Sequence, residues 1–134
     1  MFLFVFLGQL VPGIVMAQAF KTPARGSELR ANLMDALRPL VAKELGQPIE
    51  FVVETLRVSG DAAFANVTPQ RPGGGVILNP NGDEGFDGVH TQALNLREGN
   101  QWVVMHMAIG ATDVWWADPA LCREFSAVIP EVCR

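Results

Sequence analysis

The sequence that decides the fold is Val89-His90-Thr91-Gln92-Ala93-Leu94-Asn95-Leu96-Arg97, followed closely by Gln101-Trp102-Val103-Val104-Met105-His106-Met107-Ala108-Ile109. Each segment has the composition of a β-strand, and Glu98-Gly99-Asn100 between them supplies a glycine that accepts the positive φ of a tight turn. The pattern predicts an antiparallel hairpin. With the turn centred on Gly99, we expect His106 to lie near Gln92 and His90 near Ile109 or Ala108.

Two further strands are predicted upstream of this hairpin. Residues 49–58 and 62–68 are rich in strand-forming residues and are separated by the turn Ser59-Gly60-Asp61. The apolar alternation of the first strand changes phase near Thr55-Leu56, which predicts a β-bulge. We expect Pro69 to end the second strand and Val76-Ile77-Leu78 to start a third, with the rest of residues 70–88 forming a long loop.

A long helix precedes the strands. Ser27 is a good N-cap residue, Gly46 and Pro48 are typical of a helix end, and Pro39 within the pattern predicts a kink or a restart. The apolar positions recur at helical spacing, and they are Leu29, Leu33, Leu37, Leu40, Val41 and Leu45. This apolar face requires a sheet to cover it.

The C-terminal region carries a short helix and both cysteines. Asp118-Pro119 is a favourable N-cap and first-turn pair, and it predicts a short helix through Phe125. Cys122 and Cys133 form an even pair in a chain that we expect to be exported, so a disulfide is the favoured interpretation. Together the elements predict an α+β fold in which one long bent helix packs on a four-stranded antiparallel meander sheet, with a short C-terminal helix. This arrangement is of the cystatin-like or NTF2-like kind.

The first 19 residues have the character of a signal peptide rather than of a folded segment. Residues 1–16 are almost wholly apolar, and Ala17-Gln18-Ala19 has the small-x-small pattern of a signal-peptidase site. The apolar segment is short for a membrane span of roughly 20 residues, so we expect no stable membrane anchor after cleavage. We expect residues 20–134 to form a single domain located in the periplasm or outside the cell. An uncleaved N-terminal anchor is the alternative.

Three sequence stretches resemble a group of small exported bacterial proteins with a GATDVW-type C-terminal motif. They are Gly26-Ser27 with Leu37-Arg38-Pro39, Pro69-Gln70-Arg71-Pro72-Gly73-Gly74, and Gly110-Ala111-Thr112-Asp113-Val114-Trp115. The similarity covers most of residues 20–134, although the group has Trp where Ala63 precedes Phe64 here. The resemblance implies export and an α+β fold. It implies no activity and assigns no catalytic residue.

The best candidate binding residues follow the hairpin. Asp113 lies just past a strand end beside Trp115 and Trp116, where a carboxylate and two indoles suit a ligand. In the competing interpretation, Thr112 or Asp113 caps the turn and one of the two Trp side chains fills the core under the long helix. His106 and Arg71 are further candidates, the latter within a glycine-rich loop able to hold an anion. We predict no metal site, no cofactor and no catalytic motif.

A net charge of −4 argues against nucleic-acid binding, which requires a basic face. We expect a small exported binding or accessory domain whose partner is a small molecule or a protein. One alternative is an NTF2-like enzyme, a lyase, isomerase or hydrolase that uses His106 or Asp113 as a base in a cavity between helix and sheet. Another is an inhibitor of a secreted enzyme that inserts the 70–88 loop. Of these, a non-enzymatic role is favoured.

Overall fold

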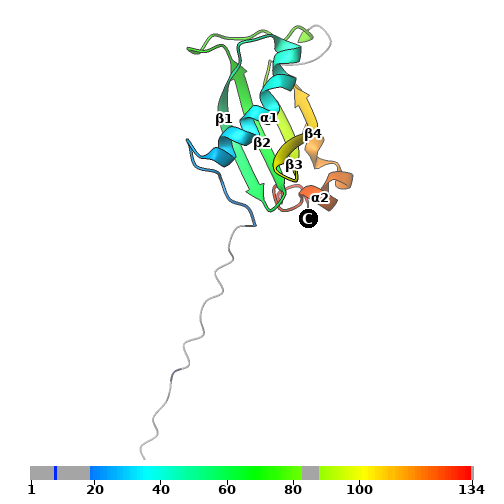
Figure 1. Cartoon of the computed structure of the whole chain (residues 1–134). Coiled ribbons are helices and arrows are strands. Elements are labelled where there is room, and N and C mark those ends of the chain that lie inside the picture. The colour runs from blue at the N-terminus through cyan, green and yellow to red at the C-terminus, as the bar shows by residue number, and fades with distance from the viewer. Residues whose placement is uncertain (1–7, 9–18, 83–87, 134) are drawn as a thin grey trace, which may run out of the picture.

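The computed structural model describes residue 8 and residues 19–82 and 88–133, so the predicted signal peptide and part of the 70–88 loop lie outside the described residues. A single long helix lies across one face of a β-sheet, and a short C-terminal segment lies at one end of the opposite face (Figure 1). The elements are α1 (Glu28–Leu45), β1 (Glu50–Ser59), β2 (Ala62–Gln70), β3 (Thr91–Glu98), β4 (Gln101–Ile109), η2 (Trp115–Ala117), η3 (Pro119–Leu121) and α2 (Cys122–Phe125).

The sheet is an antiparallel meander with the strand order β1-β2-β3-β4. The predicted α+β fold with one long helix, four antiparallel strands and a short C-terminal helix is therefore confirmed. Gly99 adopts a φ of 62°, as the predicted hairpin turn requires.

Local sequence signals explain where α1 begins and ends. The Ser27 hydroxyl accepts a hydrogen bond from the Arg30 backbone N–H at 3.3 Å, and Gly46 ends the helix with a φ of 80°. The helix runs continuously through Pro39 rather than restarting there. Its apolar side packs on the odd-numbered side chains of β2 and β3, and together they form the larger core.

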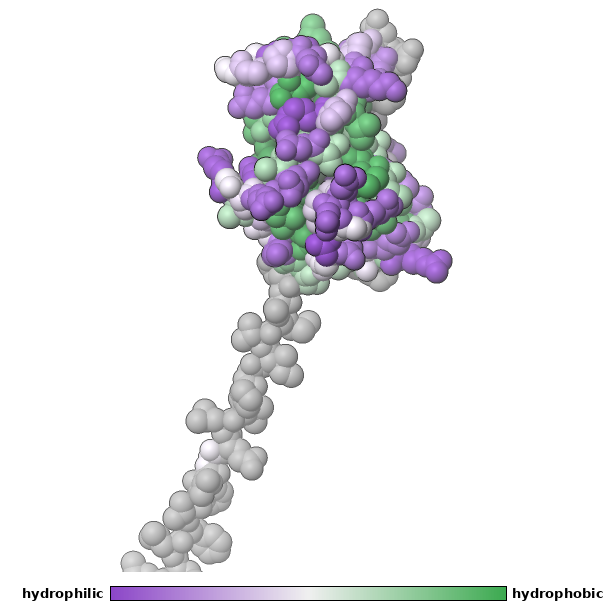
Figure 2. Space-filling model, viewed as in Figure 1, coloured by the Kyte–Doolittle hydropathy of each residue, from purple (hydrophilic) through white to green (hydrophobic). Residues whose placement is uncertain are grey.

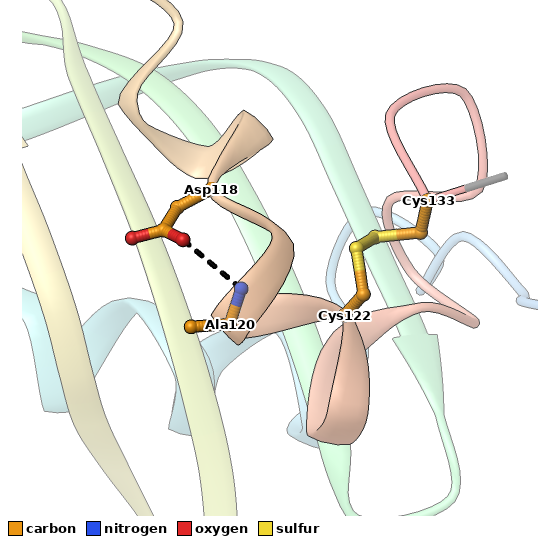
Figure 3. Close-up of a disulfide and its surroundings, with 4 residues drawn as sticks. All are labelled: Asp118, Ala120, Cys122 and Cys133. Carbon is orange, nitrogen blue, oxygen red and sulfur yellow. Dashed lines mark hydrogen bonds between the residues drawn. A yellow bond between two sulfur atoms is a disulfide. The ribbon is translucent and has the colours of Figure 1, made fainter.

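The opposite face of the sheet is covered over only part of its length. Phe64 and Leu94 on this face pack with Phe125, Val128 and Ile129 of the C-terminal segment in a second, smaller core. The predicted disulfide is confirmed: Cys122 and Cys133 are bonded, with an S–S distance of 2.06 Å (Figure 3). Asp118 caps the turn before α2 by accepting from the Ala120 N–H at 3.0 Å, as its position before Pro119 predicted.

Two strand boundaries differ from the predictions. β2 continues through Pro69 to Gln70, because its pairing with β3 stops at Val67 and Pro69 lies where β2 has only β1 as a neighbour. The prediction that the third strand starts at Val76 is wrong. Residues 76–78 form no strand, and only Ile77 among them is buried against the larger core.

The predicted register of the hairpin is also wrong. Its turn contains only Gly99 and Asn100 between the paired residues Glu98 and Gln101, and an extra residue, Met105, makes a bulge in β4. His106 therefore lies opposite Leu94 instead of Gln92. The predicted bulge in β1 is confirmed one residue earlier, at Glu54, between the paired residues Val53 and Thr55.

Candidate functional site

Three polar side chains from neighbouring strands meet on the sheet face that is turned away from α1. The Thr68 hydroxyl donates to Glu54 Oε1 at 3.3 Å, and Thr68 Oγ1 lies 3.0 Å from His90 Nδ1. His90 Nε2 lies 3.1 Å from Glu54 Oε2. We call Glu54, Thr68 and His90 the polar cluster. Glu54 and His90 are both partly exposed, so the cluster is accessible from solvent.

The backbone explains why these side chains meet. Thr68 shares the face of Phe64 because side chains alternate along β2, and His90 lies just before β3, next to Thr68 in the extension of the β2–β3 register. Glu54 is the extra residue of the β1 bulge, and bulges redirect side chains at sheet edges and beside active sites. Phe51 and Val53 face α1, so Val52 and Glu54 alternate onto the opposite face, where Val52 pairs with Thr68. The alternation along β1 therefore brings the carboxylate to the face of the cluster, and the bulge changes which residues face α1 only after Glu54.

A second pair of polar side chains extends the cluster toward the covered part of the same face. Gln92 Nε2 donates to Asn66 Oδ1 at 3.5 Å, and Trp115 Nε1 donates to Gln92 Oε1 at 3.3 Å. Trp115 also packs against the smaller core. The indole therefore forms the boundary between the apolar half of this face and its polar half.

The segment from Gly110 to Val114 connects two points on this polar half. The Gly110 N–H donates to the His90 carbonyl at 2.7 Å, and Trp115 at the other end bonds to Gln92. The loop between them, with the exposed Asp113, is thus anchored at both ends beside the polar cluster. The structure brings the predicted residues Asp113 and Trp115 to one region of the molecule.

Trp116 and His106, which were also predicted to bind a ligand, lie outside the polar cluster. Trp116 packs on Phe64 with a ring-centroid distance of 5.6 Å and belongs to the smaller core. His106 is exposed in β4, and its ring lies edge-on to Phe125 with a centroid distance of 6.1 Å. Because His90 lies beside Gly110 and His106 opposite Leu94, the two imidazoles are not neighbours.

Arg71 binds the C-terminal end of α1. Its guanidinium donates to the carbonyls of Leu45, Gly46 and Pro48 at 2.8, 2.7 and 3.0 Å. The last carbonyls of a helix lack intrahelical partners and carry partial negative charge, so a cation stabilises them. The side chain predicted to bind an anion thus holds the 70–88 loop against the end of α1. Residues 83–87 of that loop, which an inhibitory wedge would use, lie outside the described residues.

Grooves between α1 and the sheet edges do not bring the predicted residues together. The largest has a volume of about 450 Å³ and is lined by Asp35, Arg38, Pro39, Ala42, Gln47, Pro48 and Ile49. Two others lie beside Trp102 on the opposite side of α1. Neither His106 nor Asp113 lines any of these three grooves.

Within residue 8, residues 19–82 and residues 88–133, no group of three or more His, Cys, Asp or Glu side chains is arranged to hold a metal ion. No helix in the same ranges is long and apolar enough to cross a membrane.

Sequence reasoning missed Glu54, Thr68, His90 and Gln92 as site residues. Two signals were present in the sequence. The phase change in β1 indicated a bulge, and polar residues at alternate positions, Asn66 and Thr68 in one strand and His90 and Gln92 in the next, interrupt a face that is otherwise apolar. These signals indicate a common site only when it is known which residues of neighbouring strands lie opposite one another.

No family model matches the chain, and no curated protein or solved structure shows significant similarity to it. The function is therefore inferred from the geometry of the polar cluster and its surroundings.

Proposed function

We propose that the chain is a small exported binding or accessory domain that holds a neutral, hydroxyl-rich ligand, such as a saccharide, at the polar cluster. The observation that carries this proposal is the gathering of a carboxylate, an imidazole and a hydroxyl within 3.0 to 3.3 Å of one another, open to solvent. Each of these groups accepts or donates hydrogen bonds, as a ligand rich in hydroxyl groups requires.

The surroundings of the cluster favour the same class of ligand. Trp115 offers an apolar ring beside the polar groups, and binding sites combine such surfaces with a few polar groups that fix orientation. Asp113 lies on the adjacent loop, where its carboxylate can accept a further ligand hydroxyl. The cluster has one formal carboxylate and no Lys or Arg, which suits a neutral ligand better than an anion.

The disulfide supports the export part of the proposal. Disulfides persist in oxidising compartments and are rare in the reducing cytosol. We propose that residues 1–19 are a signal peptide that directs export of the chain, and that the domain is of the cystatin-like or NTF2-like kind. N-terminal sequencing of protein purified from the native host should find Phe20 as the first residue, and retention of Met1 would contradict cleavage.

Ligand binding is best tested by NMR titration of the purified protein with a panel of neutral mono- and disaccharides. We expect shifts at the His90 imidazole and the Trp115 indole N–H. Glu54→Gln and Asp113→Asn should each weaken binding about tenfold, the effect of losing roughly 1.4 kcal/mol of hydrogen bonding. Glu124→Gln, an exposed carboxylate in α2, is the matched control and should not change the affinity. Shifts confined to other surfaces would refute the assignment.

A second candidate function is ester hydrolysis at the same cluster. If His90 is the Nε2–H tautomer and the Thr68 hydroxyl turns from Glu54 to the imidazole, Thr68 donates to Nδ1 while Nε2 donates to Glu54, which is the nucleophile–base–orienter order of a catalytic triad. Thr68 Oγ1 would attack the ester carbonyl carbon as its proton moves to His90. The imidazolium would then protonate the departing alcohol, and water would hydrolyse the acyl-Thr68.

Thr68→Val separates the two candidates. It removes the nucleophile with little change in size, and p-nitrophenyl acetate reports the reaction. If the cluster hydrolyses esters, release of p-nitrophenol by the wild type should exceed that by the variant by at least about 100-fold. Equal rates in both proteins would exclude the triad mechanism and leave ligand binding as the proposal.

A further inference from the structure

The outer edge of the sheet at β4 is open. β4 pairs with β3 on one side, and among residues 19–82 and 88–133 no strand or isolated bridge pairs with its other side. Such an edge presents unpaired backbone N–H and C=O groups along a strand of nine residues. These groups form a template for another strand.

The opposite edge of the sheet, at β1, is protected in ways that β4 is not. Lys21 forms two backbone hydrogen bonds of 2.8 Å with Val58, so the N-terminal segment covers part of that edge. β1 also carries Glu50, Glu54 and Arg57, and charges on edge strands oppose pairing between molecules. β4 contains no Asp, Glu, Lys or Arg, and the only feature of β4 that opposes pairing between molecules is the bulge at Met105.

Apolar side chains also remain partly uncovered along β4. On the α1 side of this strand, four large apolar residues pack at the margin of the larger core and stay partly exposed: Trp102, Val104, Met107 and Ile109. Met105 is 44% exposed at the bulge. Figure 2 shows strongly apolar residues reaching the surface on the side of the molecule where β4 lies. A strand added at this edge would cover them.

We propose that β4 pairs antiparallel with β4 of a second copy of this chain across a two-fold axis, joining the two sheets into one. An uncharged strand is self-complementary, because a two-fold axis places no like charges together along it. The net charge of −4 is thus carried by other surfaces of each copy. A charged peptide, by contrast, would find no opposite charge in β4.

The symmetry gives a direct test at Met105. This residue lies at the middle of β4, at its bulge, so antiparallel pairing centred on the strand brings it close to its own copy near the two-fold axis. Its exposure makes substitution tolerable for the fold. Met105→Lys and Met105→Glu should each weaken the dimer at least tenfold, because each puts like charges together at the axis. Mixing the two variants should restore a dimer, since opposite charges then meet.

Sedimentation velocity over a range of concentrations measures these outcomes on the disulfide-bonded protein. Val52→Lys is the matched control, because Val52 is 46% exposed on the protected edge and should leave dimerisation unchanged. Recovery on mixing also excludes misfolding as the cause of dissociation. A wild-type protein that stays monomeric at hundreds of micromolar would overturn the proposal. A dimer that both Met105 variants leave intact would overturn it equally, because another surface would then hold the copies together.

Discussion

The two faces of the sheet are stabilised in different ways. The face under α1 is covered by one 18-residue helix whose apolar side chains come from a regular pattern within a single segment. The other face is covered by short turns, two tryptophans and a disulfide, and beyond Trp115 it remains polar and open. The face under α1 therefore carries the larger core, which stabilises the fold. The other face carries the smaller core and leaves part of the sheet exposed for the polar cluster.

The largest effect should come from the helical face. Leu37 is 1% exposed in the larger core, so Leu37→Ala should lower the free energy of unfolding by roughly 2–5 kcal/mol, measured by urea denaturation. Leu40 on the same helix is 41% exposed, and Leu40→Ala is the control, with an expected change within about 0.5 kcal/mol. Equal losses in the two variants would show that α1 does not bury one side selectively.

The disulfide should be the largest single contribution on the other face. Cys122 and Cys133 are separated by 11 positions, and a loop of this size contributes on the order of 3 kcal/mol in the chain-entropy model. Replacing both cysteines with Ser should lower stability by about that amount. Reductant should destabilise the wild type but not this double variant. If reductant leaves the wild-type denaturation curve unchanged, the C-terminal segment holds its place without the covalent bond.

A smaller difference should separate two aspartates of the C-terminal region. Asp118 caps a turn, so Asp118→Ala should cost about 1 kcal/mol, or several degrees of Tm in a domain of this size. Asp113 is exposed, and we expect Asp113→Ala to change Tm little while Asp113→Asn and Asp113→Ala both weaken ligand binding. If Asp113→Ala instead melts much earlier and Asp113→Asn binds normally, Asp113 is a cap and not a binding residue.

The smallest expected effect concerns a polar group on the helical face. Asn95 is buried on the α1 side of β3, and its Oδ1 has no hydrogen-bond partner among the described residues. Replacing an unsatisfied polar group with an apolar one of similar size is neutral or stabilising. Asn95→Leu should therefore raise the free energy of unfolding by about 1 kcal/mol or less, measured by thermal denaturation. A clear loss of stability would indicate that the Asn95 amide has a partner in solution.

The same contrast explains how much of the structure the sequence could predict. α1 and the hairpin depend on signals within one segment: the spacing of Leu33 and Leu37, the cap at Ser27 and the glycine at the turn. The disulfide could be predicted because only two cysteines are present. These features needed no knowledge of how distant segments pair.

The polar cluster could not be predicted in the same way. Glu54 and His90 are far apart in the sequence, and they meet because β1 and the segment that leads into β3 lie on either side of Thr68 in β2. In the hairpin, the two-residue turn and the bulge at Met105 together place His106 opposite Leu94 and not opposite Gln92. One inserted residue changes which side chains share a face, so a site built across strands depends on the register.

Arg57 has a consequence for the chain as a whole. Its guanidinium lies 4.6 Å from the centroid of the Phe20 ring and bonds to Glu131 at 2.7 Å and to the Val128 carbonyl at 3.1 Å. One side chain thus joins the start and the end of the described fold. A short linker between these ends, with new termini opened at Gly60 in the β1–β2 turn, should give a circularly permuted protein that still folds. In such a protein the order of the elements along the chain would change, while α1 would still pack on one face of the sheet and the C-terminal segment on the other.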